Sequence, residues 1–272
     1  MSHLVKKTLT VQGAHGTHRQ TYYVAPQEGQ GVLLLKSGEK AGSTRIQTVA
    51  PAERIKIHYG LLWSRKANAG VNEAVRAIGA VHNVPKDLYR IPIKVTGSLD
   101  GANGVYKIWQ PHGGNEINVS KWAATPAATA AHEYGHFLDH HLFGDGRPTW
   151  NGLGTHNRKS KELAPLMESL YRSKAIREVV QKHTEHEKNK DHQGQDVTRY
   201  LLDPAEIFAR GYAQYIGVRG SKQIHTEIQD CRAAWQSHGY SGQWEDKDFE
   251  PIAREFDRLF ANRRLSRVRS TT

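Results

Sequence analysis

Residues 125–144 read TPAATAAHEYGHFLDHHLFG and contain the pattern His-Glu-x-x-His at residues 132–136. Thr125 is a favourable residue at the amino end of a helix, and Pro126 suits the first helical position. The alanine-rich run that follows propagates a helix, and Gly144 is expected to end it. The sequence therefore predicts that the pattern lies in the middle of one helix.

The spacing of this pattern indicates its chemistry. His132 and His136 lie one turn apart on one face of a helix, where two imidazole nitrogens can bind one Zn²⁺ ion. Glu133 projects from the same side and can take a proton from a water molecule that the metal activates. Gly135 costs ~1 kcal/mol relative to alanine inside a helix, which predicts close approach of another backbone. The competing interpretation is a polar surface helix with two spare histidines.

A catalytic zinc needs a third protein ligand. Metzincins would place a histidine at position 142, where this chain has Leu142, and His141 is one residue short. The better candidate is Glu206, in the segment DPAEIFAR at residues 203–210. At the start of a second helix Glu206 could face the first helix across the site, and Arg210, one turn later, could pair with it.

Alternatives stay open for the carboxylates. Asp203 and Glu206 have nearly the spacing of a capping box, in which the glutamate would bond back to the backbone amide of the capping residue. Asp139 follows His136 by three residues, so it is a rival metal ligand or a partner that fixes a histidine tautomer.

Other polar side chains have weaker claims to a role. Tyr212 or Tyr215 could donate a hydrogen bond to the oxyanion of a tetrahedral intermediate, although packing in the core is the favoured interpretation. The segment 182–192 is wholly polar and is predicted to be a solvated, mobile loop. Three of its histidines could instead bind a second metal: His183, His186 and His192.

The chain is predicted to have three parts. Residues 1–50 form a β-hairpin and a linker, residues 51–262 form the main domain, and residues 263–272 form a basic tail. The strand at 116–119 alternates polar and apolar residues, which is typical of an edge strand. Further elements are predicted as strands at 91–95 and 104–109 and as helices at about 68–82, 158–183, 204–216 and 246–262.

Composition is typical of a globular protein. Of the 272 residues, 38% are hydrophobic, and no apolar run approaches the ~20 residues that span a bilayer. No secretory signal is visible, so a cytoplasmic or virion-associated protein is expected. The single cysteine excludes an internal disulfide and a cysteine-based zinc site. The net charge of +11 and the arginines of 263–269 favour nucleic acid or another polyanion as a partner.

Three blocks of the sequence resemble a known family. Residues 104–119, 131–139 and 203–210 resemble zincin-like metallopeptidase domains, above all those encoded by bacteriophages and other mobile elements. The resemblance covers about residues 85–262. The chain departs from the family in its basic tail and in the polar segment 182–195, which looks like an insertion.

The resemblance implies a fold and an activity. The expected fold is α+β and zincin-like, with a small, partly antiparallel sheet packed on an active-site helix and a helical C-terminal half. His132, His136 and Glu206 are implied as zinc ligands, and Glu133 as the general base and acid of peptide hydrolysis. A protein or peptide substrate would bind in extended form along the strand at 116–119.

Two other functions stay open at this stage. The chain could be a nucleic-acid-associated phage or virion protein whose zinc site is structural or degenerate. DNA binding would then depend steeply on salt and would be the same in the Glu133→Gln protein. The chain could also be a toxin or virion component whose peptidase acts on one host protein.

Overall fold

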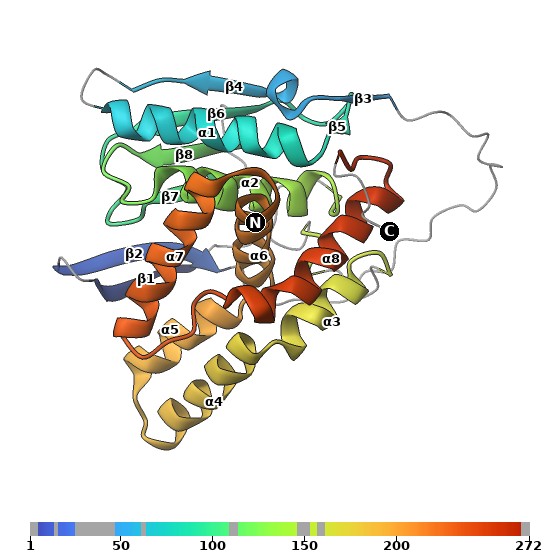
Figure 1. Cartoon of the computed structure of the whole chain (residues 1–272). Coiled ribbons are helices and arrows are strands. Elements are labelled where there is room, and N and C mark those ends of the chain that lie inside the picture. Colours follow the sequence, from blue (N-terminus) through green and yellow to red (C-terminus); the bar gives the residue numbers. More distant parts are fainter. Residues whose placement is uncertain are drawn as a thin grey trace.

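The computed structural model describes residues 5–13, 16–24, 47–60, 64–108, 114–145, 153–156 and 161–267. It is a mixed α/β structure with a small sheet, and in the described residues only helices follow the last strand (Figure 1). The strands are β1 (Val5–Gly13), β2 (Gly16–Val24), β3 (Thr48–Val49), β4 (Ile55–His58), β5 (Val84–Pro85), β6 (Ile91–Thr96), β7 (Gly104–Lys107) and β8 (Glu116–Ser120). The helices are α1 (Arg65–Val81), α2 (Pro126–His141), α3 (Ala164–Arg172), α4 (Lys174–Lys188), α5 (His192–Leu202), α6 (Pro204–Gly220), α7 (Lys222–Ser237) and α8 (Asp246–Asn262).

The main sheet has the strand order β4-β6-β8-β7, and only β7 runs antiparallel to its neighbour. Strand β8 therefore lies inside the sheet, so the prediction of an edge strand at 116–119 is wrong, and β7 is the edge. The polar residues of β8 find partners on the flanking strands, because Glu116 accepts hydrogen bonds from Lys94 of β6 and Lys107 of β7. Burial opposes ionisation of Glu116, but these bonds lower its pKa to about 2.

Helix α2 runs through the middle of the molecule. It packs beside α1, against β7 and β8 of the sheet, and against α6 on its other side (Figure 1). Every residue from Pro126 to His140 is buried except His132, so the surface-helix interpretation is wrong. The expected close approach at Gly135 is confirmed, because a Cβ there would lie 3.0 Å from the Cα of Ala209 in α6.

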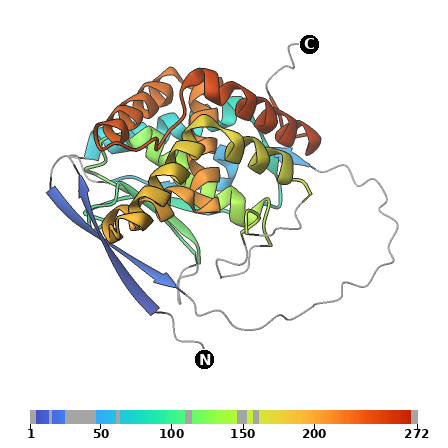
Figure 2. The ribbon, with the colours of Figure 1, turned by 90° about the horizontal axis from the view of Figure 1, so that it is seen from below.

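The C-terminal helices differ from the prediction, which did not include α5 or α7. The helix expected at 158–183 is broken at Ser173, whose hydroxyl oxygen accepts from the backbone N–H of Ile176 and from the indole N–H of Trp244. Because Ser173 caps α4, α3 and α4 become separate helices. Figure 2, seen from below, shows α3, α4 and α5 in front of α6.

The polar segment 182–192 consists of the end of α4, a turn at 189–191 and the first residue of α5, so the prediction of a loop over the whole segment is wrong. Its histidines supply packing contacts between the two helices. His183 Nδ1 lies 2.7 Å from the Thr198 hydroxyl of α5, and His186 Nδ1 lies 2.7 Å from a carboxylate oxygen of Asp191, which caps α5. A polar run can remain helical when its partners lie on a neighbouring helix, which periodicity alone does not show.

The described residues include the N-terminal hairpin and the first part of the predicted C-terminal tail. Strands β1 and β2 pair as an antiparallel hairpin where one was predicted, and the linker residues 25–46 lie outside the described residues. Residues 263–267 of the expected tail pack on the domain: Leu265 is buried, and the Arg267 backbone amide donates to the Val81 carbonyl. The last five residues, 268–272, also lie outside the described part.

One buried histidine should make stability depend on pH. His82 is fully buried and stacks on Phe260, and its Nδ1 lies 2.8 Å from the Asn83 carbonyl oxygen. A carbonyl only accepts, so Nδ1 carries the proton and Nε2 accepts from the Tyr212 hydroxyl at 2.7 Å. Burial lowers the pKa of His82 to about 4. The folded state then binds fewer protons than the unfolded chain between pH ~6.5 and ~4, so stability is complete above pH ~6.5 and falls below it.

We expect His82 to contribute a loss of about 2 kcal/mol in unfolding free energy between pH 7.5 and pH 5. Urea unfolding at both pH values measures it. The His82→Gln protein, which has no titratable group at this position, should show a smaller pH dependence by that amount. Equal pH dependence in the two proteins would show that His82 does not cause the effect.

Candidate metal centre

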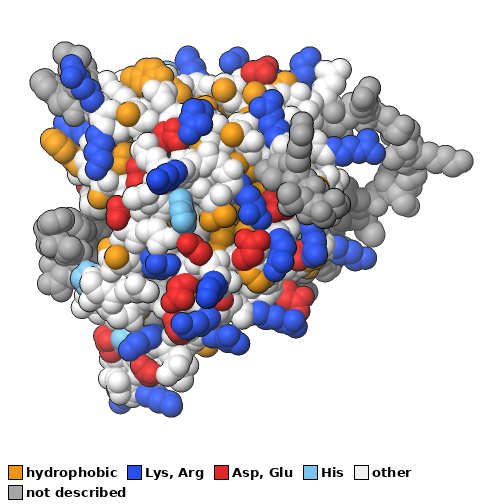
Figure 3. Space-filling model, viewed as in Figure 1, with side chains coloured by type: hydrophobic (Ala, Val, Ile, Leu, Met, Phe, Trp, Pro, Cys, Tyr) orange, Lys and Arg blue, Asp and Glu red, His pale blue; other side chains and the backbone are white. Residues whose placement is uncertain are grey.

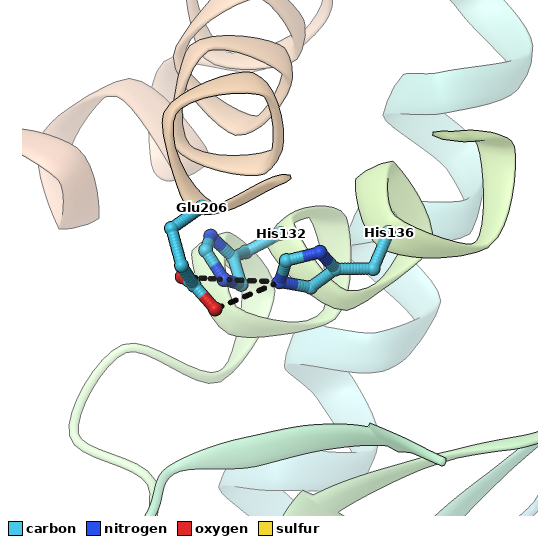
Figure 4. Close-up of side chains that lie close together, drawn as sticks. All are labelled: His132, His136 and Glu206. Atoms are coloured by element: carbon cyan, nitrogen blue, oxygen red, sulfur yellow. Dashed lines mark hydrogen bonds and ion pairs between the residues drawn. The ribbon is translucent and has the colours of Figure 1, made fainter. Parts of the chain in front are cut away.

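The two central helices bring three predicted residues together. In α2, His132 is the one residue between Pro126 and His140 that is not buried. In α6, Glu206 is the one residue between Ala205 and Gly217 that is not buried. These two side chains are 17% and 16% exposed, and they face each other where α2 and α6 meet. His136 points into the same space from the next turn of α2 (Figure 4). Two otherwise buried helices thus meet at one polar opening.

The three side chains lie close enough together to hold one metal ion, and each imidazole lies near a different oxygen of Glu206. His132 Nε2 and His136 Nε2 lie 3.2 Å apart, and each lies 3.3 Å from a Glu206 carboxylate oxygen. With zinc bonds of 2.0–2.1 Å, neighbouring ligands of a tetrahedron lie about 3.3–3.4 Å apart. One oxygen of Glu206 and the Nδ1 of His136 are buried without a hydrogen-bond partner among the described residues. The cluster His132, His136 and Glu206 can therefore hold a metal ion.

Without a metal, the same groups share protons. Burial opposes charge on His136, but the Glu206 carboxylate outweighs it and raises the pKa of His136 to about 9. Burial likewise favours a neutral Glu206, but the two imidazoles hold its pKa well below the usual value. A metal ion must displace the proton on His136, so its uptake releases protons near neutral pH.

The start of α6 positions Glu206. The Asp203 carboxylate caps the helix by accepting from the backbone amides of Ala205 at 2.8 Å and Glu206 at 3.4 Å. The Glu206 carboxylate turns to the two imidazoles and not back to the capping residue, so the structure does not show the capping-box alternative. Asp203 and Pro204 supplied the local signal that placed this helix correctly.

Arg210 supports Glu206 differently from the prediction. Its guanidinium donates to three backbone carbonyls, those of Glu206, Leu201 and Gly242, and not to the Glu206 carboxylate. Instead of the predicted ion pair with the Glu206 side chain, Arg210 forms a clamp, which here means its three hydrogen bonds to backbone carbonyls. This clamp joins the first turn of α6 to the end of α5 and to the segment before α8.

Asp139 is not part of the metal cluster. It is fully buried and accepts from the backbone amide of Thr155 at 2.8 Å and from its hydroxyl at 2.6 Å. Burial raises the pKa of Asp139 to about 6. Because the Nδ1 of His136 has no hydrogen-bond partner among the described residues, Asp139 does not fix its tautomer by a direct bond either. Asp139 instead holds the segment around Thr155 against the carboxyl end of α2.

The other predicted polar residues lie elsewhere. The Tyr212 hydroxyl bonds to His82 and the Tyr215 hydroxyl to Asp257, so both pack in the core as the favoured interpretation held. His183, His186 and His192 form no metal cluster in the part of the chain that the structure describes.

Sequence reasoning missed Tyr200, which lies in α5 beside the metal cluster. Burial, together with the neighbouring Glu206 carboxylate, raises the pKa of Tyr200 well above its ordinary value. Tyr200 lines the same cavity as His132 and Glu133. No sequence pattern pointed to Tyr200, because the sequence did not predict the helix α5 that carries it.

Glu133 lies between the metal cluster and the edge strand β7. Its side chain is buried, and burial raises its pKa. A Cβ at Gly104, the first residue of β7, would lie 2.9 Å from a carboxylate oxygen of Glu133. Only a glycine therefore lets the strand pass this close. The described site thus combines three side chains that could hold a metal ion, a carboxylate of raised pKa and the edge of a sheet.

Comparisons give the chain no relative. No protein-family model, curated protein or solved structure matches it. Among the described residues, no helix is long and apolar enough to cross a membrane. On the face in Figure 3, Lys and Arg side chains are interspersed with Asp and Glu. A polyanionic partner therefore stays a prediction.

Proposed function

We propose that this protein is a zinc-dependent metallopeptidase with a zincin-like arrangement of active-site helix and edge strand. The observation that carries the proposal is the cluster of His132, His136 and Glu206, whose ligand atoms lie close enough together to hold one metal ion. Glu133 follows the first ligand directly and supplies the one acidic group that hydrolysis needs beside the metal.

In the proposed hydrolysis, the metal and Glu133 would have separate roles. A zinc ion at this site supplies Lewis acidity and makes a water molecule acidic enough to lose a proton near neutral pH. Glu133 takes that proton and later gives it to the leaving amine. Burial raises the pKa of Glu133, which makes it a stronger base than an exposed glutamate.

The edge strand β7 gives the peptide a place to bind. Among the described residues, strand β7 pairs in the sheet with β8 alone, so its other edge could receive an extended peptide. The strand begins at Gly104, against Glu133. Substrate addition to the sheet, expected at 116–119, is therefore proposed for β7.

Metal removal tests the proposal directly. The zinc-loaded protein should hydrolyse a mixture of unstructured peptides, lose this activity when a chelator removes the metal, and regain it when zinc is restored. Mass spectrometry of the products locates the cleaved bonds. A preparation with one zinc per chain that cleaves no peptide in the mixture would contradict the proposal.

Replacing Gly104 by alanine should impair hydrolysis without removing zinc. The added Cβ would lie 2.5 Å from the Cγ2 of Thr129 and 2.9 Å from a Glu133 oxygen, so the base must move. A displacement of ~1 Å can cost ~100-fold in rate, and we expect a fall of that order in kcat/KM.

Gly97→Ala is the matched control, because a Cβ at Gly97, just after β6, meets nothing within 4 Å. Its kcat/KM and zinc content should equal those of the wild type. An equally active Gly104→Ala protein would show that the position of Glu133 against β7 does not limit the rate.

A further inference from the structure

Of the phenylalanine, tyrosine and tryptophan side chains whose exposure the structure describes, the two most exposed lie at one end of the main sheet. Tyr59 directly follows β4 and is 57% exposed, and Trp122 follows β8 by two residues and is 69% exposed. Strands β4, β6 and β8 run parallel, so both residues lie at the same end of the sheet, on the left in Figure 1. Only β6 separates β4 from β8, which places these two strands about 10 Å apart.

Hydrogen bonds to the start of α1 hold this end of the sheet in place. The Tyr59 hydroxyl donates to the side-chain oxygen of Asn72 at 2.8 Å, which fixes the edge of the ring and uses neither of its flat faces. The Lys66 ammonium donates to the Ala124 carbonyl at 2.7 Å and so ties α1 to the segment that carries Trp122. Because these contacts exist in the free protein, a ligand does not have to order this end of the sheet on binding.

Positive charge surrounds the two rings. Arg65 and Lys66 are exposed at the start of α1, and the Lys121 ammonium lies 4.7 Å from the centre of the neighbouring indole ring. The segments that supply this end of the sheet, 54–72 and 117–132, contain no aspartate or glutamate. The charge at the carboxyl ends of β4 and β8 therefore favours an anionic ligand.

Flat rings among cations suit single-stranded nucleic acid. Its unpaired bases stack on aromatic side chains while its phosphates attract lysine and arginine. In a duplex the bases are already stacked on one another, so the exposed faces of the two rings would gain no base contact. Asp100, in the adjoining loop between β6 and β7, lines the cavity beside the metal centre, so we expect the strand to run from β4 to the segment after β8 and to avoid this loop.

We propose that single-stranded nucleic acid binds to an aromatic and basic surface formed by Tyr59, Arg65, Lys66, Lys121 and Trp122. Bases stack on the two rings, and the three cations neutralise phosphates of the same strand. The inference does not rest on the proposed function, because none of these five residues belongs to the metal cluster.

The test measures binding of a fluorescein-labelled oligothymidylate of about 12 nucleotides to the full chain by fluorescence anisotropy. With three phosphates neutralised, the logarithm of the association constant should fall with the logarithm of the salt concentration with a slope of about −2. Trp122→Ala should raise Kd at least ~5-fold, whereas Trp122→Phe, which keeps a ring, should stay within ~2-fold of the wild type. Lys121→Glu should raise Kd and make the salt dependence less steep. Binding should be the same with and without zinc.

Tyr171→Ala and Lys188→Glu are the matched controls, because they change an exposed tyrosine on α3 and an exposed lysine at the end of α4. Both proteins should bind the oligonucleotide like the wild type. Equal weakening by Lys121→Glu and Lys188→Glu would show that the overall charge attracts the strand, and this result would overturn the inference. A Trp122→Ala protein with the wild-type Kd, or a duplex of the same length bound as tightly as the single strand, would overturn it as well. Binding to phosphatidylserine vesicles by a protein that does not bind the oligonucleotide would identify a membrane surface instead.

Discussion

The Glu206→Ala protein is expected to lose stoichiometric zinc, whereas the wild type is expected to bind one zinc per chain. Glu206 presents one carboxylate oxygen to each imidazole at 3.3 Å, and the described residues contain no other carboxylate in the cluster. With alanine, two histidines remain, and two ligands do not hold a catalytic zinc. Loss of a direct ligand should cost more than the ~10–100-fold in affinity that follows loss of an outer partner.

Asp139→Asn is the informative control for this experiment. Asp139 was the rival ligand from the sequence, but its carboxylate bonds to Thr155 and lies outside the cluster. The Asp139→Asn protein should therefore retain one zinc per chain. Metal content after dialysis is measured by mass spectrometry for zinc and iron together, and circular dichroism confirms that each variant is folded. A Glu206→Ala protein with one zinc per chain would show that Glu206 is not a ligand.

Local signals predicted the two helices that carry the candidate site. Pro126 and Pro204 each occupy the first helical position, and the spacing of His132 and His136 placed both imidazoles on one face. The position of Glu206 also followed from the sequence, because the residue lies in the first turn of its helix. That Glu206 faces the histidines depends on tertiary packing. The spacing of residues could suggest this arrangement, but only the packing of α2 on α6 shows it.

The parts that sequence did not predict depend on contacts between distant segments. Strand β8 resembled an edge because Glu116 and Asn118 alternate with apolar residues, but Lys94 and Lys107 on the flanking strands bond with Glu116 inside the sheet. The polar end of α4 resembled a loop because its partners, such as Thr198, lie on α5. The cavity beside the metal centre was invisible for the same reason, since α5 and α7 supply much of its wall.

The Glu133→Gln protein is expected to retain one zinc per chain and to lose peptide hydrolysis by a factor of ~100–10,000. Glutamine has nearly the same shape as glutamate, so the contacts with β7 should persist, but its amide cannot accept the proton of the attacking water. Because none of the proposed ligands changes, a fall in rate with constant zinc isolates proton transfer from metal binding. The kcat/KM of zinc-loaded protein and its metal content are measured on the same preparation.

The pH profile strengthens this test. In the wild type, kcat/KM should fall at low pH as Glu133 becomes protonated, and burial, which raises its pKa, moves that fall above the range of an exposed glutamate. The residual kcat/KM of the Glu133→Gln protein should not show this fall at low pH. Glu187→Gln, at an exposed position of α4, is the matched control and should keep the wild-type profile.

A Glu133→Gln protein with the wild-type rate would exclude Glu133 as the base. A peptidase with Glu133 as its base would then be excluded as well, and a structural role for the metal would be favoured.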